Sequence, residues 1–117
     1  MVRAPIVYAV FVMMLWLGLG WATDSHAQAE LPTYDVVAKG GRLSPERIEV
    51  PAGKRIKIAI RNEGPGPIEF ESSSMRIEKV LASGGASFVV LPPLKPGAYS
   101  FIDEFHPETG TMQLIAR

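Results

Sequence analysis

The side chains best able to do chemistry lie close together near the end of the sequence. His106 is the only histidine after the first 26 residues, and the carboxylates of Asp103, Glu104 and Glu108 stand on both sides of it. Imidazole nitrogen and carboxylate oxygens together can bind a borderline divalent ion or a trivalent ion. A histidine flanked by acidic residues is also common on a plain solvent-exposed surface. The segment alone therefore leaves a metal site and a surface loop as alternatives.

Composition excludes several other kinds of chemistry. The chain of 117 residues contains no cysteine, which excludes disulfides, thiolate nucleophiles, cysteine-based zinc sites and iron–sulfur clusters. Its 12 basic and 12 acidic residues balance, so there is no basic excess to attract nucleic acid phosphates. The apolar fraction of 47% is typical of a globular protein, and the length fits one small domain. We expect a single folded domain that does not bind nucleic acid.

The segment that leads to His106 has the alternation of a β-strand. Tyr99, Phe101 and Asp103 fall on one side of this strand, because successive side chains point to opposite faces. Two aromatic side chains that enter a core are thus followed, on the same side, by a carboxylate at the rim. A carboxylate in such a place is costly unless it is paired, protonated or bound to a cation. Asp103 is therefore expected to have a partner.

The elements that position this segment are expected to be β-strands throughout. After residue 30, no window keeps apolar residues at helical spacing for three turns, whereas Ile56, Ile58 and Ile60 alternate with polar or small residues. Proline- and glycine-rich turns separate the apolar runs. This pattern predicts an all-β sandwich of about eight strands. The expected strands cover residues 34–38, 47–50, 55–62, 68–71, 79–81, 87–91, 98–103 and 112–116.

The first 29 residues have the three parts of a secretory signal peptide. A basic residue is followed by the uncharged run Ala4–Ala22 and by small residues that end at Ala27 and Ala29. We predict a signal peptide over residues 1–27, with cleavage after Ala29 as the alternative, and an exported domain over residues 28–117. The uncharged run is also near the length that crosses a bilayer, so an uncleaved membrane anchor is the competing interpretation.

Several motifs in the domain occur in the order and at the spacing of a known family. The most specific is a Pro-Gly-x-Tyr-x-Phe strand that runs into Asp-x-Phe-His. In these motifs the sequence resembles the cupredoxin fold, and specifically the cupredoxin-like domains of the EfeO type that accompany bacterial iron-uptake permeases. The resemblance covers about residues 33–117 and implies a Greek-key β-sandwich in the periplasm. The motifs are Ser44-Pro45, Val50-Pro51-Ala52-Gly53, Ile58–Asn62, Ile68–Ser72, Ile77–Val80 and Leu94–His106.

The resemblance also implies a metal site that differs from a blue-copper site. Where blue-copper relatives carry their first histidine and their cysteine, this sequence has Glu69 and Asp103, and only His106 is kept. A type 1 copper site needs a cysteine thiolate and is therefore impossible here. Carboxylates in these positions favour iron or Cu(II). The implied ligands are first Glu69, Asp103 and His106, then Glu78 and Glu104, with Glu71 and Glu108 as weaker candidates; Met112 is expected in the core.

The sequence thus predicts a periplasmic metal-binding protein that assists bacterial iron uptake. Its cofactor would be an iron or copper ion, and its partner would be an inner-membrane iron permease or another periplasmic uptake component. Two alternatives stay open. The domain could be a ferroxidase component that works with partners, since one mononuclear site carries only one electron. It could also be a metal-free interaction domain that docks another subunit through its acidic end.

Overall fold

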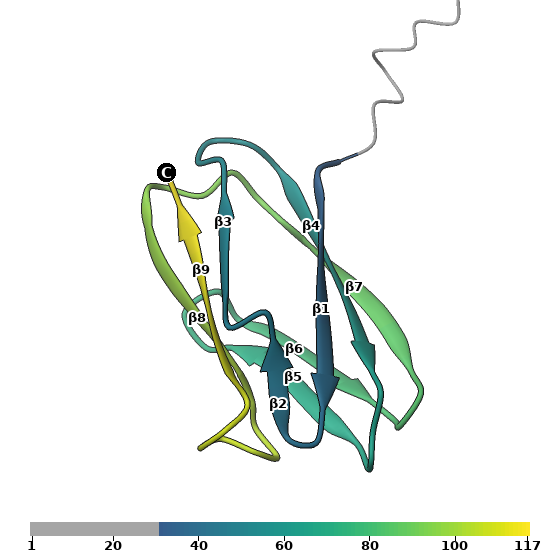
Figure 1. Ribbon diagram of the computed structural model, residues 1–117. Helices are drawn as coiled ribbons and strands as arrows, with labels where there is room; N and C mark the ends of the chain where they lie inside the picture. The colour runs from purple at the N-terminus through teal and green to yellow at the C-terminus, as the bar shows by residue number, and fades with distance from the viewer. Residues whose placement is uncertain (1–30) are drawn as a thin grey trace, which may run out of the picture. The chain divides into compact units, whose positions relative to one another are not determined.

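The computed structural model describes residues 31–117, which form nine β-strands and no helix (Figure 1). The expected signal peptide lies outside the described residues. Within residues 31–117 there is no helix long and apolar enough to span a membrane. The all-β prediction is confirmed. The strands are β1 (Thr33–Lys39), β2 (Arg42–Ser44), β3 (Arg47–Val50), β4 (Ile56–Asn62), β5 (Ile68–Ser72), β6 (Ile77–Leu81), β7 (Ala86–Leu91), β8 (Gly97–Asp103) and β9 (Thr111–Ala116).

The strands form two sheets that pack as the two layers of a sandwich (Figure 1). One sheet has four strands in the order β2-β1-β4-β7, and the other has five in the order β3-β9-β8-β5-β6. Most neighbours are antiparallel, but β1 runs parallel to β4 and β3 runs parallel to β9. The chain changes sheets between β2 and β3, at a cis Ser44-Pro45 peptide bond. Neighbours in space are thus often distant in sequence.

Alternation along β4 sets the inner face of the four-stranded sheet. Ile56, Ile58 and Ile60 are almost completely buried, as the sequence pattern predicts. The sandwich has nine strands rather than about eight, because β2 was not expected from the sequence. This strand has three residues, of which only Leu43 is buried. A strand with one apolar side chain shows no alternation in the sequence.

The core is fixed by two aromatic rings at the centre of the five-stranded sheet. Phe70 of β5 and Phe101 of β8 are fully buried, with ring centroids 4.8 Å apart and an interplanar angle of 12°. Met112 of β9, in register with Phe101, is 2% exposed and belongs to the same hydrophobic core. Its expected role in packing is confirmed. The stacked rings fix the position of the end of β8 against β5.

Asn62 ends β4 as a buried polar side chain that fixes the corner after it. Its Nδ2 donates to the carbonyl oxygens of Gly66 at 2.9 Å and Leu81 at 3.2 Å. Its Oδ1 accepts a hydrogen bond from the N–H of Gly64 at 2.8 Å. Gly64 has a φ of 74°, which glycine adopts without strain. One amide group therefore joins β4, the loop to β5 and the end of β6.

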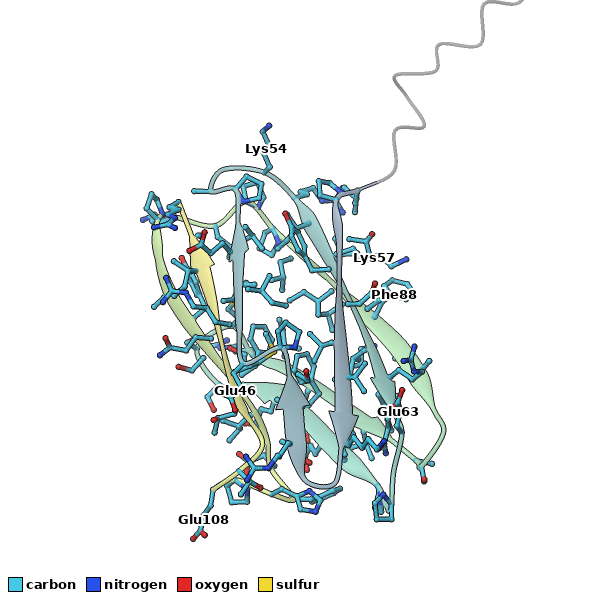
Figure 2. The ribbon with its side chains drawn as sticks, in the orientation of Figure 1. Glu46, Lys54, Lys57, Glu63, Phe88 and Glu108 are labelled. Atoms are coloured by element: carbon cyan, nitrogen blue, oxygen red, sulfur yellow. The ribbon has the colours of Figure 1, made fainter. Side chains whose placement is uncertain are left out.

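Asn62→Leu is expected to destabilise the fold, because it leaves the buried N–H of Gly64 and the carbonyl of Leu81 without their partner. Each such group costs about 1–3 kcal/mol of unfolding free energy. Urea denaturation followed by circular dichroism measures the loss. The control is Lys54→Gln, a change at a side chain that projects into solvent (Figure 2). Equal stability of the two variants would contradict the structural role of Asn62.

Candidate functional site

Asp103 is the last residue of β8, and its side chain points into the sandwich. It lies opposite Phe70 of β5 in the antiparallel register, and only 1% of its surface is exposed. It follows Tyr99 and Phe101 on the inner face, as the alternation of the sequence predicts. A buried carboxylate must be stabilised by hydrogen bonds or by an opposite charge. The groups around Asp103 therefore determine what it can do.

Three hydrogen bonds stabilise the Asp103 carboxylate. Oδ1 accepts hydrogen bonds from the backbone N–H groups of Glu69 and Phe105, each at 3.0 Å. Oδ2 lies 2.6 Å from Nδ1 of His106. Hydrogen bonds to an ionised carboxylate are about twice as strong as neutral ones, so they offset the cost of burying the charge. The protein itself thus supplies the partner that the sequence pattern requires for Asp103.

His106 lies in the loop between β8 and β9, with its ring held on two sides. Its Nδ1 faces a carboxylate oxygen, which accepts hydrogen bonds, so the proton of the neutral ring lies on Nδ1 and the lone pair on Nε2. The Cδ2 edge of the ring lies against Gly41 in the β1–β2 turn, where an added Cβ would be 2.9 Å away. The side chain is 38% exposed. Nε2 is therefore the ring nitrogen left for a ligand.

Four glutamates gather on the outer face of the five-stranded sheet. Glu69 and Glu71 alternate with buried residues along β5, so both point outward. Glu78 of β6 lies directly opposite Glu71 in the register. Glu104 follows the end of β8, and its N–H donates to the carbonyl oxygen of Glu69 at 2.9 Å. We refer to Glu69, Glu71, Glu78 and Glu104 as the glutamate cluster.

Close contact between carboxyl groups determines the electrostatics of the glutamate cluster. A hydrogen bond with the carboxyl group of Glu78 raises the pKa of Glu69 from 4.5 to about 7, with smaller contributions from partial burial and from the negative charges of Glu78, Glu71 and Glu104. The pKa of Glu104 is also raised, chiefly by the carboxyl group of Glu71. None of the ion pairs formed within residues 31–117 includes a member of the cluster. Glu69 therefore retains a proton at pH values where an ordinary surface glutamate has lost it.

The structure divides the five ligands expected from the sequence into two groups. Asp103 and His106 face each other at the end of the sandwich, whereas Glu69, Glu78 and Glu104 belong to the outer glutamate cluster. The backbone links the two groups, since the N–H of Glu69 donates to Asp103. With the side chains of residues 31–117 as they stand, no three histidine or acidic side chains surround a point where a metal ion fits. A single site that includes all five residues stays a prediction.

The two weaker candidates differ in where they lie. Glu71 is a full member of the glutamate cluster, and its spacing of two residues from Glu69 in a strand already places both on one face. Glu108 projects into solvent in the β8–β9 loop (Figure 2). No sequence motif pointed to Gly41 and Gly110, which leave room for the ring of His106 and for the side chain of Asp103. A Cβ on Gly110 would lie 2.7 Å from that of Asp103. Only the folded structure shows these close approaches.

The two sheets with this strand order, closed at one end by a loop that carries a histidine, define a cupredoxin-like β-sandwich. The chain belongs to the family whose model is described as a cupredoxin-like domain, which matches residues 9–116. It is also similar to an uncharacterized protein of Rickettsia prowazekii (strain Madrid E), with 32% identity over 74 residues. That match covers 63% of this chain and spans 59% of the length of the curated relative.

Solved structures share the fold at low sequence identity. The metal-binding domain of the Cu(I)-exporting P-type ATPase of Streptococcus pneumoniae has a TM-score of 0.65 at 13% identity, covering 73% of this chain and 84% of that one. Auracyanin from Roseiflexus castenholzii has a TM-score of 0.59 at 12% identity, covering 73% and 96%. A purple cupredoxin from Nitrosopumilus maritimus has a TM-score of 0.52 at 15% identity, covering 71% and 98%. The cupredoxin fold expected from the sequence is confirmed.

The residues present do not fit the type 1 copper site of blue-copper proteins. Such a site requires a cysteine thiolate with two imidazoles, and this chain has no cysteine and, after residue 26, one histidine. Both oxygens of Asp103 are already engaged by hydrogen bonds within the protein. The oxygen donors of the glutamate cluster fit a harder ion instead.

Asp103→Ala is expected to lower the free energy of unfolding by about 3 kcal/mol or more, because three donors lose a buried, charged acceptor. In Asp103→Asn one oxygen remains for the backbone N–H groups, but an amide N–H₂ now faces the ring of His106. The ring proton should therefore move from Nδ1 to Nε2. Nitrogen-15 NMR of the imidazole reads the tautomer, and a His106 that keeps its Nδ1 proton in Asp103→Asn would contradict the hydrogen-bond assignment.

Proposed function

We propose that this protein is a periplasmic, metal-binding cupredoxin-like protein of the EfeO type, and that it assists bacterial iron uptake. In this proposal the metal ion binds at the glutamate cluster on the outer face of the five-stranded sheet. The ion would be exchanged with an inner-membrane iron permease or another periplasmic uptake component. Membership of the cupredoxin-like family supports a metal-binding role in general. The choice of iron rests on the sequence motifs that resemble the EfeO type.

The observation that carries the proposal is the uncompensated like charge of the glutamate cluster. Four carboxylates converge on one face, and the pKa of Glu69 is raised to about 7 by its acidic neighbours. No lysine or arginine forms an ion pair with the cluster within the described part of the chain. A bound cation would relieve this repulsion, and the repulsion would in turn favour binding of the cation.

The donor atoms of the cluster restrict the class of ion. Carboxylate oxygens suit hard and borderline ions, such as iron ions and Cu(II), and are poor ligands for Cu(I), which prefers thiolate and thioether sulfur. The similar domain of the Streptococcus pneumoniae ATPase was solved with Cu(I). We propose that this cysteine-free chain binds, on the same fold, an ion that is harder than Cu(I).

A metal-free docking domain is the second candidate function. The observation that favours it is the present arrangement of the cluster, whose carboxyl groups interact as the pairs Glu69 with Glu78 and Glu71 with Glu104. No group of three donors in residues 31–117 is arranged around a metal position. Metal binding would therefore require rotation of these long, partly exposed side chains, whereas docking of a basic partner would not.

Titration with Fe(II), Fe(III) and Cu(II) tests the proposed site. Glu69→Gln and Glu78→Gln are each expected to weaken binding of the preferred ion by at least about tenfold, because each removes a charged ligand without changing the side-chain shape. The matched control is Glu108→Gln, which removes the same charge from a solvent-exposed loop. Isothermal titration calorimetry of protein purified without chelators gives the affinities.

Two outcomes would overturn the proposed site. If none of the three ions binds the wild-type protein, the metal-free docking role becomes the better interpretation. If His106→Ala abolishes Cu(II) binding while Glu69→Gln leaves it unchanged, the ion binds at His106 and not at the glutamate cluster. Circular dichroism of each protein checks that the fold is intact, so that loss of structure does not explain either result.

The raised pKa of Glu69 predicts an unusual dependence of stability on pH. Because this pKa is about 7 in the folded protein and 4.5 in the unfolded chain, the folded state binds more protons between these values. The contribution of Glu69 to stability is therefore present below about pH 4.5 and is lost as the pH rises to about 7. Urea denaturation at several pH values should show a larger loss in metal-free wild type than in Glu69→Gln, which keeps the raised pKa of Glu104.

Metal binding should have the opposite pH dependence, because Glu69 must lose its proton before it can act as a ligand. We expect affinity to rise between about pH 5.5 and 7.5 more steeply in wild type than in Glu69→Gln. The comparison with this variant separates Glu69 from His106, which is present in both proteins. Identical pH profiles for the two proteins would show that Glu69 is not a ligand.

A further inference from the structure

The two sheets end in four edge strands, and one of them lacks the usual protection. Edge strands expose unpaired backbone N–H and C=O groups, and charged side chains normally keep them from pairing with other chains. Three edges of the sandwich carry such charges: Arg42 on β2, Arg47 and Glu49 on β3, and Glu78 and Lys79 on β6. The fourth edge, β7, has the sequence Ala-Ser-Phe-Val-Val-Leu, with no charge, proline or glycine.

The outer face of β7 is also unusually apolar. Phe88 and Val90 point outward, and they are 52% and 37% exposed. Val89 and Leu91 alternate with them and are buried in the core. The register with β4 is continuous over all six residues of β7, so no bulge twists this edge away from a partner. Within residues 31–117 the strand is therefore free of bulges, uncharged and unpaired along one side.

The ring of Phe88 contacts a charged side chain, Lys57 of β4. The Nζ of Lys57 lies 4.4 Å from the centroid of the Phe88 ring, and both side chains project from the outer side of the sheet (Figure 2). The register places Ala59 opposite Phe88 and Lys57 opposite Val90. The lysine lies over one face of the ring, and among residues 31–117 no strand pairs with the outer edge of β7, the last strand of its sheet.

We propose that β7 pairs with β7 of a second copy of this chain, antiparallel and about a two-fold axis at Val89. In this register Phe88 of each copy lies directly opposite Val90 of the other, on the same outer face. The two four-stranded sheets then become one continuous eight-stranded sheet. This proposal concerns association of the protein and does not depend on the proposed metal site.

Self-complementarity is what favours a second copy over another partner. A two-fold axis at Val89 forms two aromatic and β-branched cross-strand pairs, a combination that stabilises antiparallel sheets. Because β7 carries no charge, the pairing brings no like charges face to face. A two-fold axis at the middle residue of β6 would place Lys79 of one copy opposite Lys79 of the other, which is unfavourable. The uncharged sequence of β7 and its exposed pair Phe88 and Val90 thus favour pairing of β7 with itself.

Sedimentation velocity of the purified protein over a range of concentrations tests the proposal. Wild type is expected to show a monomer–dimer equilibrium. The double substitution Phe88→Glu and Val90→Glu places two carboxylates opposite each other at both pairs, and should raise the dimer dissociation constant by at least about tenfold. Within one copy the same carboxylates lie near Lys57, so the monomer should stay folded. The matched control, Val80→Lys on β6, changes an apolar side chain that is 62% exposed and should not affect dimerisation.

Charge reversal makes the test specific for this register. A variant with Phe88→Lys and Val90→Lys should also be monomeric alone, but mixed with the double glutamate variant it should form a heterodimer, since each pair then joins opposite charges. The proposal is overturned if wild type is monomeric throughout the concentration range. It is equally overturned if the double glutamate variant dimerises like wild type, or if the mixture of folded variants does not associate.

Discussion

The geometry of the end of the sandwich that carries the β8–β9 loop depends on one buried charge, the carboxylate of Asp103. Placing a carboxylate inside a β-sandwich is unfavourable unless donors surround it, and here the donors come from three segments. The N–H of Glu69 belongs to β5, the N–H of Phe105 to the turn after β8, and Nδ1 to His106 in the β8–β9 loop. The requirement for donors thus fixes the position of β5 against β8 and the path of the loop. Hydrogen bonds within the protein thus hold the end of the sandwich that carries the β8–β9 loop.

Strands β5 and β8 carry different kinds of side chains on the two faces of the sheet. On the inner face, Phe70, Phe101 and Asp103 form a packed and hydrogen-bonded interior. On the outer face, Glu69 and Glu71 repel Glu78 and Glu104. Like-charge repulsion on a surface can be tolerated when the backbone beneath it is held by other interactions. The inner network provides that support, because the N–H of Glu69 itself donates to Asp103.

Much of the fold could be predicted from alternation, and the site could be predicted only in part. Ile56, Ile58 and Ile60 show their buried face without any structural information, whereas β2 has too few apolar residues to be recognised. The need of Asp103 for a partner also follows from the sequence. The position of Asp103 relative to the carboxyl group of Glu69 could not be predicted from the sequence. It depends on the strand register that pairs Phe70 with Asp103. One residue of register decides whether Glu69 faces inward or outward.

The parallel pairing of β3 with β9 has a consequence for how quickly the chain can fold. Ile48 lies beside Leu114, and β3 has no other neighbour in its sheet. Strand β3 can therefore pair only after β9, near the end of the chain, has come beside it. Closing so long a loop costs chain entropy before any contact compensates for it. Topologies with many such distant contacts fold in milliseconds to seconds rather than microseconds. During that interval the apolar side chains of the strands stay accessible to other molecules, which is when the chain is most open to association before the sandwich closes.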